Sequence, residues 1–69
     1  MKRLSTPVEI LNAALEKEHD ARDFYEKLAA QSRTDFVRDL LHHLQNEEEK
    51  HADLIRKMLS RLEAGHSPS

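Results

Sequence analysis

The clearest pattern in the chain is a regular spacing of apolar residues in its second half. Intervals of four and three residues alternate along one series of positions: Val37, Leu41, Leu44, Glu48, His51, Ile55, Met58 and Leu62. The same intervals occur in the first half: Leu11, Ala14, Glu18, Ala21, Tyr25 and Leu28. Such spacing is typical of the apolar seam by which a helix packs in a bundle. The pattern predicts two amphipathic helices, each with polar residues interrupting its seam.

The outer ends of the two helices are marked by residues that favour helix termini. Thr6 can serve as N-cap, Pro7 suits the first helical position, and Glu9 completes a capping box with Thr6. Gly65 is a suitable C-terminal stop and begins a polar tail, 65–69. These residues place the first helix start near residue 7 and the second helix end near residue 64.

A break between the helices is predicted at 31–35, where Gln, Ser, Arg, Thr and Asp follow one another. Several of these side chains compete with helical backbone bonding, and Thr34 can cap a second helix. We therefore predict helices at about 7–31 and 35–64, folded as an antiparallel hairpin in a single all-α domain, 1–69. Because neither Gly nor Pro lies between Pro7 and Gly65, one continuous helix of about 85 Å is the alternative.

The composition agrees with helices and predicts a partner. Of the 69 residues, 38% are hydrophobic and 35% charged, with one Gly, two Pro and three aromatic residues. A two-helix hairpin has no third layer to cover its seam, and so short a chain buries only a modest core. We therefore expect a homodimer, or a higher homo-oligomer, in which two hairpins form a four-helix bundle.

Several classes of function are excluded by what the sequence lacks. Without cysteine there can be no disulfide scaffold, thiolate metal site or cysteine nucleophile. The net charge of −2 with interspersed signs speaks against nucleic acid as a partner. No apolar run is long enough to cross a membrane. We expect a cytoplasmic protein.

The polar residues of the two seams are the candidate functional site. Glu48 and His51 are neighbours at i,i+3 on the second helix, and Glu18 interrupts the first. If the turn is centred on Arg33, then Glu18 lies 15 residues before it and Glu48 lies 15 after it. Both residues are then about 22 Å from the turn, at one level of the hairpin. The three side chains are therefore expected to converge.

Carboxylates in a helical core must be paired, protonated or bound to metal, because burying them alone is costly. The seam of the second helix contains no Lys or Arg to pair with them. Two Glu and one His are suitable ligands for iron, manganese or zinc. Two hairpins would supply four Glu and two His, the ligand set of di-iron carboxylate bundles. A site with one metal ion within one hairpin remains an alternative.

Other polar residues near this motif have simpler interpretations. The off-seam residues Glu47, Glu49 and Lys50 are expected to form a solvated face, so replacing either glutamate should change little. Four histidines also lie off the seam, where we expect at most adventitious surface binding of metal: His19, His42, His43 and His66. Met58 and Leu62 are predicted to be core residues.

Two segments resemble the ferritin-like superfamily, in its rubrerythrin-type and encapsulated-ferritin branch. The segment 14–29 reads ALEKEHDARDFYEKLA, and it is similar to a first ligand helix in which Glu precedes a Phe-Tyr pair. The segment 44–52 reads LQNEEEKHA, and it looks like the Glu-Glu-x-x-His-Ala helix of the family. Together with the residues between them, these segments extend the resemblance over roughly 8–62.

The resemblance implies a ferritin-like four-helix bundle with iron ligands Glu18, Glu48 and His51, and with Tyr25 hydrogen-bonded to a ligating carboxylate. Because this chain has one Glu-x-x-His motif, the complete site would need a second subunit. Encapsulated ferritins usually carry a C-terminal targeting peptide, and because none is seen here we do not expect residence in an encapsulating shell. The leading hypothesis is two irons per dimer, bridged by Glu48, with ferroxidase-like oxidation of Fe(II) by oxygen or peroxide in iron storage or oxidative-stress handling. The alternative is a metal-binding or structural helical oligomer without turnover.

Overall fold

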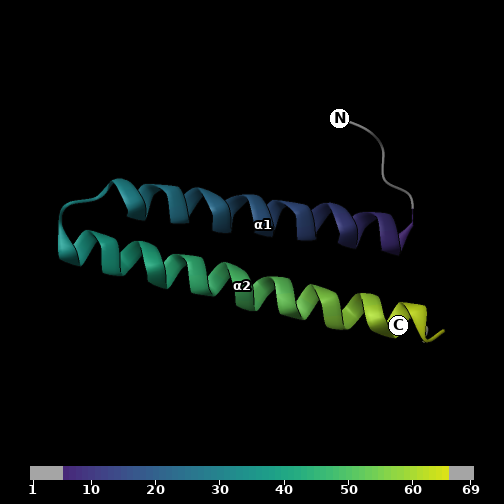
Figure 1. The fold of residues 1–69 in the computed structure, drawn as a ribbon. Helices are drawn as coiled ribbons and strands as arrows, with labels where there is room; N and C mark the ends of the chain where they lie inside the picture. Colours follow the sequence, from purple (N-terminus) through teal and green to yellow (C-terminus); the bar gives the residue numbers. More distant parts are fainter. Residues whose placement is uncertain (1–5, 66–69) are drawn as a thin grey trace.

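A computed structural model describes residues 6–65 of the chain as two antiparallel α-helices (Figure 1). Helix α1 comprises Pro7–Gln31 and corresponds to the helix predicted over 7–31. Helix α2 comprises Asp35–Glu63 and ends one residue before the predicted end. The helices pack against each other along the hairpin, so the single continuous helix is excluded. Within the described range, neither helix is long and apolar enough to span a membrane.

The outer ends of both helices have the predicted caps. The Glu9 backbone N–H donates to Thr6 Oγ1 at 3.1 Å, and the Thr6 hydroxyl donates to Glu9 Oε1 at 3.0 Å. At the other end, Gly65 has a φ of +83°, a conformation that L side chains rarely adopt. The Gly65 N–H donates to the Leu62 carbonyl at 3.0 Å. The predicted tail beyond Gly65, residues 66–69, lies outside the described residues.

The turn between the helices is closed by hydrogen bonds that require no glycine. The Thr34 N–H donates to Ser32 Oγ, and the Ser32 hydroxyl donates to the Thr34 carbonyl. The Arg38 guanidinium donates to the Ser32 carbonyl at 3.1 Å. Thr34 has the predicted N-cap position, but its side chain makes no cap hydrogen bond. Ser32 and Thr34 both have extended backbones with negative φ, so the turn needs no residue in the left-handed region.

Two alanines are the most deeply buried hydrophobic residues between the helices, Ala29 near the turn and Ala52 nearer the open end of the hairpin. Ala29 of α1 is 3% exposed and Ala52 of α2 is 0% exposed, and no other described hydrophobic residue is buried. Both helices are therefore rotated relative to the predicted seams. On α2, Glu48 remains half-buried, whereas Val37, His51 and Met58 are exposed. Met58, predicted as core, is 38% exposed because the contact is centred on Ala52.

The rotation leaves a second apolar surface, which we call the open face. Its members are exposed or half-buried in the hairpin: Ile10, Ala14, Ala21, Phe24 and Leu28 on α1, and Val37, Leu40, Leu44, Leu54 and Met58 on α2. A helix turns by about 100° per residue. By this rotation, the α1 positions all lie to one rotational side of Ala29, and the α2 positions all lie to the same rotational side of Ala52. Because the helices run in opposite directions, both sets lie on the same side of the hairpin.

The hairpin is too thin to enclose a core. Its principal extents are 47 × 25 × 14 Å and its Cα radius of gyration is 15.2 Å. A compact chain of this length would have a radius of gyration of about 11 Å. The buried contact between the two helices is therefore small, and a broad apolar surface remains uncovered in the hairpin.

Candidate metal centre

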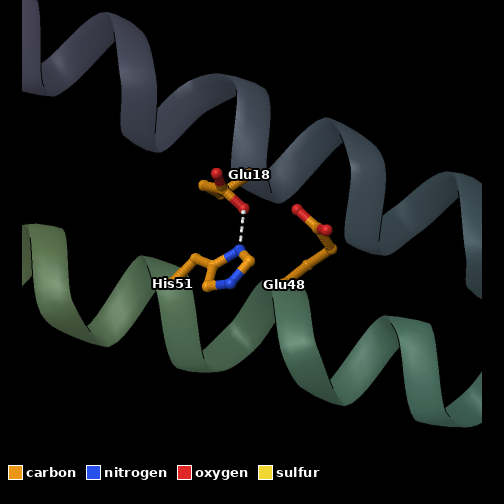
Figure 2. A group of neighbouring side chains, drawn as sticks. All are labelled: Glu18, Glu48 and His51. Carbon is orange, nitrogen blue, oxygen red and sulfur yellow. Dashed lines mark ion pairs between the residues drawn. The ribbon is translucent and has the colours of Figure 1, made fainter.

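Glu18, Glu48 and His51 converge between the helices. Each offers one ligand atom, and these atoms all lie within 4.8 Å of one another. Figure 2 shows Glu18 reaching down from α1 toward the other two side chains, which extend from α2. His51 Nδ1 is 3.3 Å from Glu18 Oε2. The structure thus brings together the three residues that the sequence singled out.

The local geometry explains why these side chains meet. Glu48 and His51 are three residues apart on α2, so they extend from neighbouring positions of one helix face. Glu18 faces them because the short turn places residues at similar sequence distances from it at one level. His51 lies toward the open face and its side chain is 51% exposed, whereas that of Glu18 is 24% exposed. The cluster is therefore covered on one side and accessible on the other.

One oxygen of Glu18 is left without a hydrogen-bond partner. Glu18 Oε2 is buried, and no donor among the described residues forms a hydrogen bond with it. His51 Nδ1 is close enough for an ion pair, but the contact lacks hydrogen-bond geometry. A buried, unsatisfied carboxylate oxygen costs free energy unless a cation or a proton compensates it. The orphaned oxygen thus points to a missing positive charge.

Glu48 is the second carboxyl group affected by this crowding. Its pKa is raised above the usual value, chiefly by the neighbouring Glu18 carboxyl group, with which it can hydrogen-bond only when one of the two groups carries a proton. Partial burial and repulsion from the Glu18 charge raise the pKa further, and only the nearby His51 opposes them appreciably. In the metal-free protein Glu48 therefore holds its proton more tightly than an ordinary glutamate does.

The raised pKa predicts how the stability of the metal-free protein depends on pH. The folded state holds the Glu48 proton more tightly than the unfolded chain, so stability should fall as the pH rises above about 4.5 toward neutrality. Glu48→Gln should flatten this part of the curve. Glu47→Gln is the control, because Lys50 lowers the pKa of Glu47 and gives no such slope. Thermal midpoints measured with a chelator should show this; a parent curve as flat as that of Glu48→Gln would contradict it.

The residues beside the cluster differ from the solvated face that we predicted. Glu47 does contact only its own helix, through Lys50 at 3.2 Å and His43 at 3.9 Å. Glu49, however, is half-buried and bonds to Arg22 at 2.9 Å and Arg56 at 3.1 Å, so the solvated interpretation is wrong for Glu49. These two arginines lower the pKa of Glu49 by hydrogen bonding, mainly that of Arg22.

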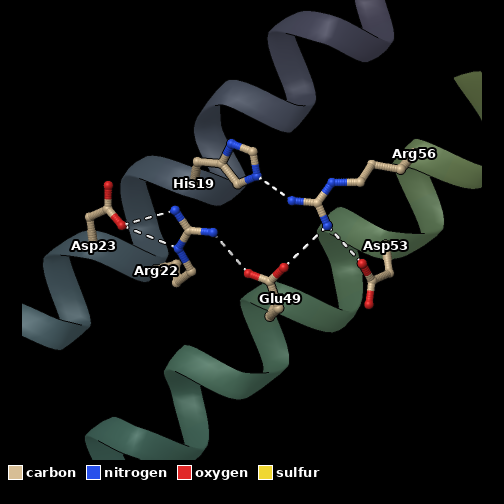
Figure 3. A network of polar contacts seen from close by, with 6 residues as sticks. All are labelled: His19, Arg22, Asp23, Glu49, Asp53 and Arg56. Atoms are coloured by element: carbon tan, nitrogen blue, oxygen red, sulfur yellow. Dashed lines mark hydrogen bonds and ion pairs between the residues drawn. The ribbon is translucent and has the colours of Figure 1, made fainter.

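The spacing of the seams does not predict this network, because all of its residues lie off the seams. Figure 3 shows it as a chain of contacts that crosses between the helices twice. His19, predicted to be a surface histidine, is half-buried, and its Nε2 lies 2.8 Å from Arg56 Nη2. Arginine side chains are long enough to reach past one helical turn. The position of an arginine along its helix therefore does not predict which residue it contacts. The sequence feature that could have predicted the network is the presence of opposite charges on the two helices.

The other residues considered from the sequence lie away from the cluster. Tyr25 is half-buried two turns after Glu18, and its ring packs beside Phe24 with centroids 6.0 Å apart. Among the described side chains, no hydrogen bond involves the Tyr25 hydroxyl, so its role toward a ligand stays a prediction. His42 lines a pocket of about 320 Å³ near the turn, with Arg38. His66 lies outside the described residues.

The three residues suit a divalent transition metal. Two carboxylates and one imidazole form a mixed oxygen and nitrogen donor set of the kind that iron, manganese and zinc accept. A cation would compensate both the orphaned Glu18 oxygen and the repulsion between Glu18 and Glu48. Three protein ligands leave further coordination positions for other groups. The cluster therefore fits a metal but does not saturate one.

Comparison with known proteins agrees with this chemistry. Residues 9–69 match the family model for rubrerythrin, which covers nearly all of both helices. Searches of curated proteins and of solved structures give no significant match. The matched range includes the complete ligand cluster. The chain therefore belongs to the rubrerythrin family of the ferritin-like superfamily, whose members generally bind iron.

Proposed function

We propose that two copies of this chain form a di-iron carboxylate site that oxidises Fe(II) with oxygen or peroxide. The observation that carries the proposal is the convergence of Glu18, Glu48 and His51 within 4.8 Å, with a buried Glu18 oxygen left unpaired. Family membership supports iron as the metal. Such an activity would serve iron storage or protection against oxidants.

A second copy is the partner that completes the ligand set. One hairpin offers two carboxylates and one imidazole, which is half of the ligand set of a di-iron bundle. Two hairpins offer four carboxylates, whose four negative charges match two divalent cations. The sharing of a site between two-helix subunits is also the feature that would relate this chain to encapsulated ferritins.

The open face supports packing against a second copy. It extends along both helices on the side toward which His51 lies, and several of its members are more than half exposed: Phe24, Leu40 and Leu54. Joining two such faces would bury them and enclose the ligand cluster at the centre of a four-helix bundle. An exposed apolar surface of this extent on an isolated hairpin favours association in water.

The chemical roles of the residues follow from their donor atoms. When bound, iron supplies the one-electron redox chemistry by which an oxidant is reduced. Glu18 and Glu48 provide hard, negatively charged oxygens, which favour the more highly charged ferric state over the ferrous state. His51 contributes a neutral nitrogen when its ring is deprotonated, so acid should weaken metal binding.

The experiment that tests this proposal joins metal content with assembly state. Protein purified without added metal should contain one iron per chain, sediment as a dimer or larger oligomer, and oxidise added Fe(II) aerobically with a ferric absorbance rise. An oligomer without metal or turnover would instead support a structural role. A folded monomer that binds one ion would support the mononuclear site and contradict the shared one.

A further inference from the structure

We propose that the polar network beside the metal ligands is a positioning device, which holds the two helices in the register that the ligand cluster requires. The network, here called the clip, consists of His19, Arg22, Glu49 and Arg56. It lies on the side of the helix contact opposite the open face. Its effect on metal binding rests on the proposed function, whereas its effect on register does not.

The clip joins the helices through one shared carboxylate. Glu49 of α2 accepts from Arg22 of α1 through Oε2 at 2.9 Å, and from Arg56 of its own helix through Oε1 at 3.1 Å. Arg56 then returns to α1 through its 2.8 Å contact with His19. Two different polar contacts therefore cross the interface (Figure 3). Because guanidinium groups bond in fixed directions, the pair resists both sliding and rotation of the helices.

The clip adjoins the ligands in sequence on both helices. His19 follows Glu18, and Glu49 follows Glu48. Arg22 lies one turn beyond Glu18. The fully buried Ala52 lies one turn beyond Glu48, with its small side chain in the contact between the helices. Any shift that breaks the clip therefore moves Glu18 relative to Glu48 and His51 as well.

Such a device is needed because little else opposes separation at this level. Glu18 and Glu48 are like charges that face each other, and the only described hydrophobic residue buried within about one turn of them is Ala52. Partly exposed ion pairs contribute little to overall stability. The clip should therefore affect the geometry of the cluster much more than the free energy of unfolding. This difference separates positioning from ordinary stabilisation.

The first test measures register without metal. Because the chain lacks cysteine, Glu16→Cys and Asn46→Cys allow spin labels on exposed positions of the two helices, away from the open face, diluted with unlabelled protein. The distance distribution should be narrow in the parent and at least twofold broader in Glu49→Gln. Glu47→Gln, the same change two residues earlier on α2, should match the parent. An unchanged distribution in Glu49→Gln overturns the proposal. If that variant does not fold, Arg22→Gln must show the same broadening.

The second test separates positioning from stability by means of Co(II) binding. Glu49→Gln should weaken Co(II) affinity at least tenfold and alter the visible spectrum of the bound ion. Thr6→Ala is the control, because it removes the N-cap of α1 and lowers the thermal midpoint far from the cluster. An equal loss of affinity in Thr6→Ala would overturn positioning. If the parent binds no Co(II) while Glu49→Gln still broadens the distances, the proposed metal function fails and the clip stands.

Discussion

Glu48→Ala is expected to abolish oxygen-dependent oxidation of added Fe(II) while leaving a helical protein. Glu48 faces both other ligand residues, so its loss leaves one carboxylate and one imidazole in each hairpin. Alanine has high helix propensity, and it would relieve the repulsion with Glu18 in the metal-free state. The metal-free variant should therefore be at least as stable as the parent near neutral pH. Ferric absorbance after aerobic Fe(II) addition measures the activity, and circular dichroism measures the fold.

Glu47→Ala is the matched control for this experiment. Glu47 is adjacent in sequence, but its contacts are with Lys50 and His43 on its own helix, about 100° away from Glu48. Oxidation by this variant should remain within about twofold of the parent, because Glu47 offers no ligand atom to the cluster and alanine is compatible with the open-face side of α2 on which it lies. Glu49→Ala cannot serve as a second control, because Glu49 bonds across the helices. If Glu47→Ala were as damaging as Glu48→Ala, the ligand assignment would be wrong.

Leu40→Glu is expected to weaken dimerisation and metal binding together. Leu40 belongs to the open face and is 55% exposed in the hairpin, so glutamate there is tolerated by one copy. In a dimer it would place a charge in an apolar interface, at a cost on the order of 2–4 kcal/mol, or roughly 30- to 1000-fold in dissociation constant. Sedimentation should show monomers at concentrations where the parent is dimeric.

The metal-binding behaviour of Leu40→Glu distinguishes a shared site from a site in one hairpin. Iron affinity should fall in dilute protein and recover as the protein concentration rises, because assembly and binding are linked by mass action. Asn46→Glu adds the same charge at an exposed position of α2 away from the open face, and it should behave as the parent. Metal binding that does not change with protein concentration in the Leu40→Glu variant would contradict the shared site.

Much of the local structure was predictable because its causes lie within a few residues of one another. The N-terminal cap depends on Thr6, Pro7 and Glu9, and the C-terminal stop depends on Gly65. The break at 32–34 was predictable from side chains that compete with helical backbone bonding. Its closure was not, because Ser32 and Arg38 complete the turn by contacts that form only when the chain has turned.

The level of the candidate ligands was also predictable from the sequence, whereas the rotation of each helix was not. The spacing of residues within a helix shows which of them share a face. A short turn places residues of the two helices that are equally distant from it at the same level, so Glu18, Glu48 and His51 could be expected to meet. Rotation depends on both surfaces at once: the helix faces that meet are those that carry Ala29 and Ala52, the two buried residues. That choice exposes Met58 and His51 on the open face and turns Glu49 toward Arg22. The sequence alone thus determined the helices, their ends and the level of the cluster. Only tertiary packing decided which faces met, because that is a property of two surfaces together.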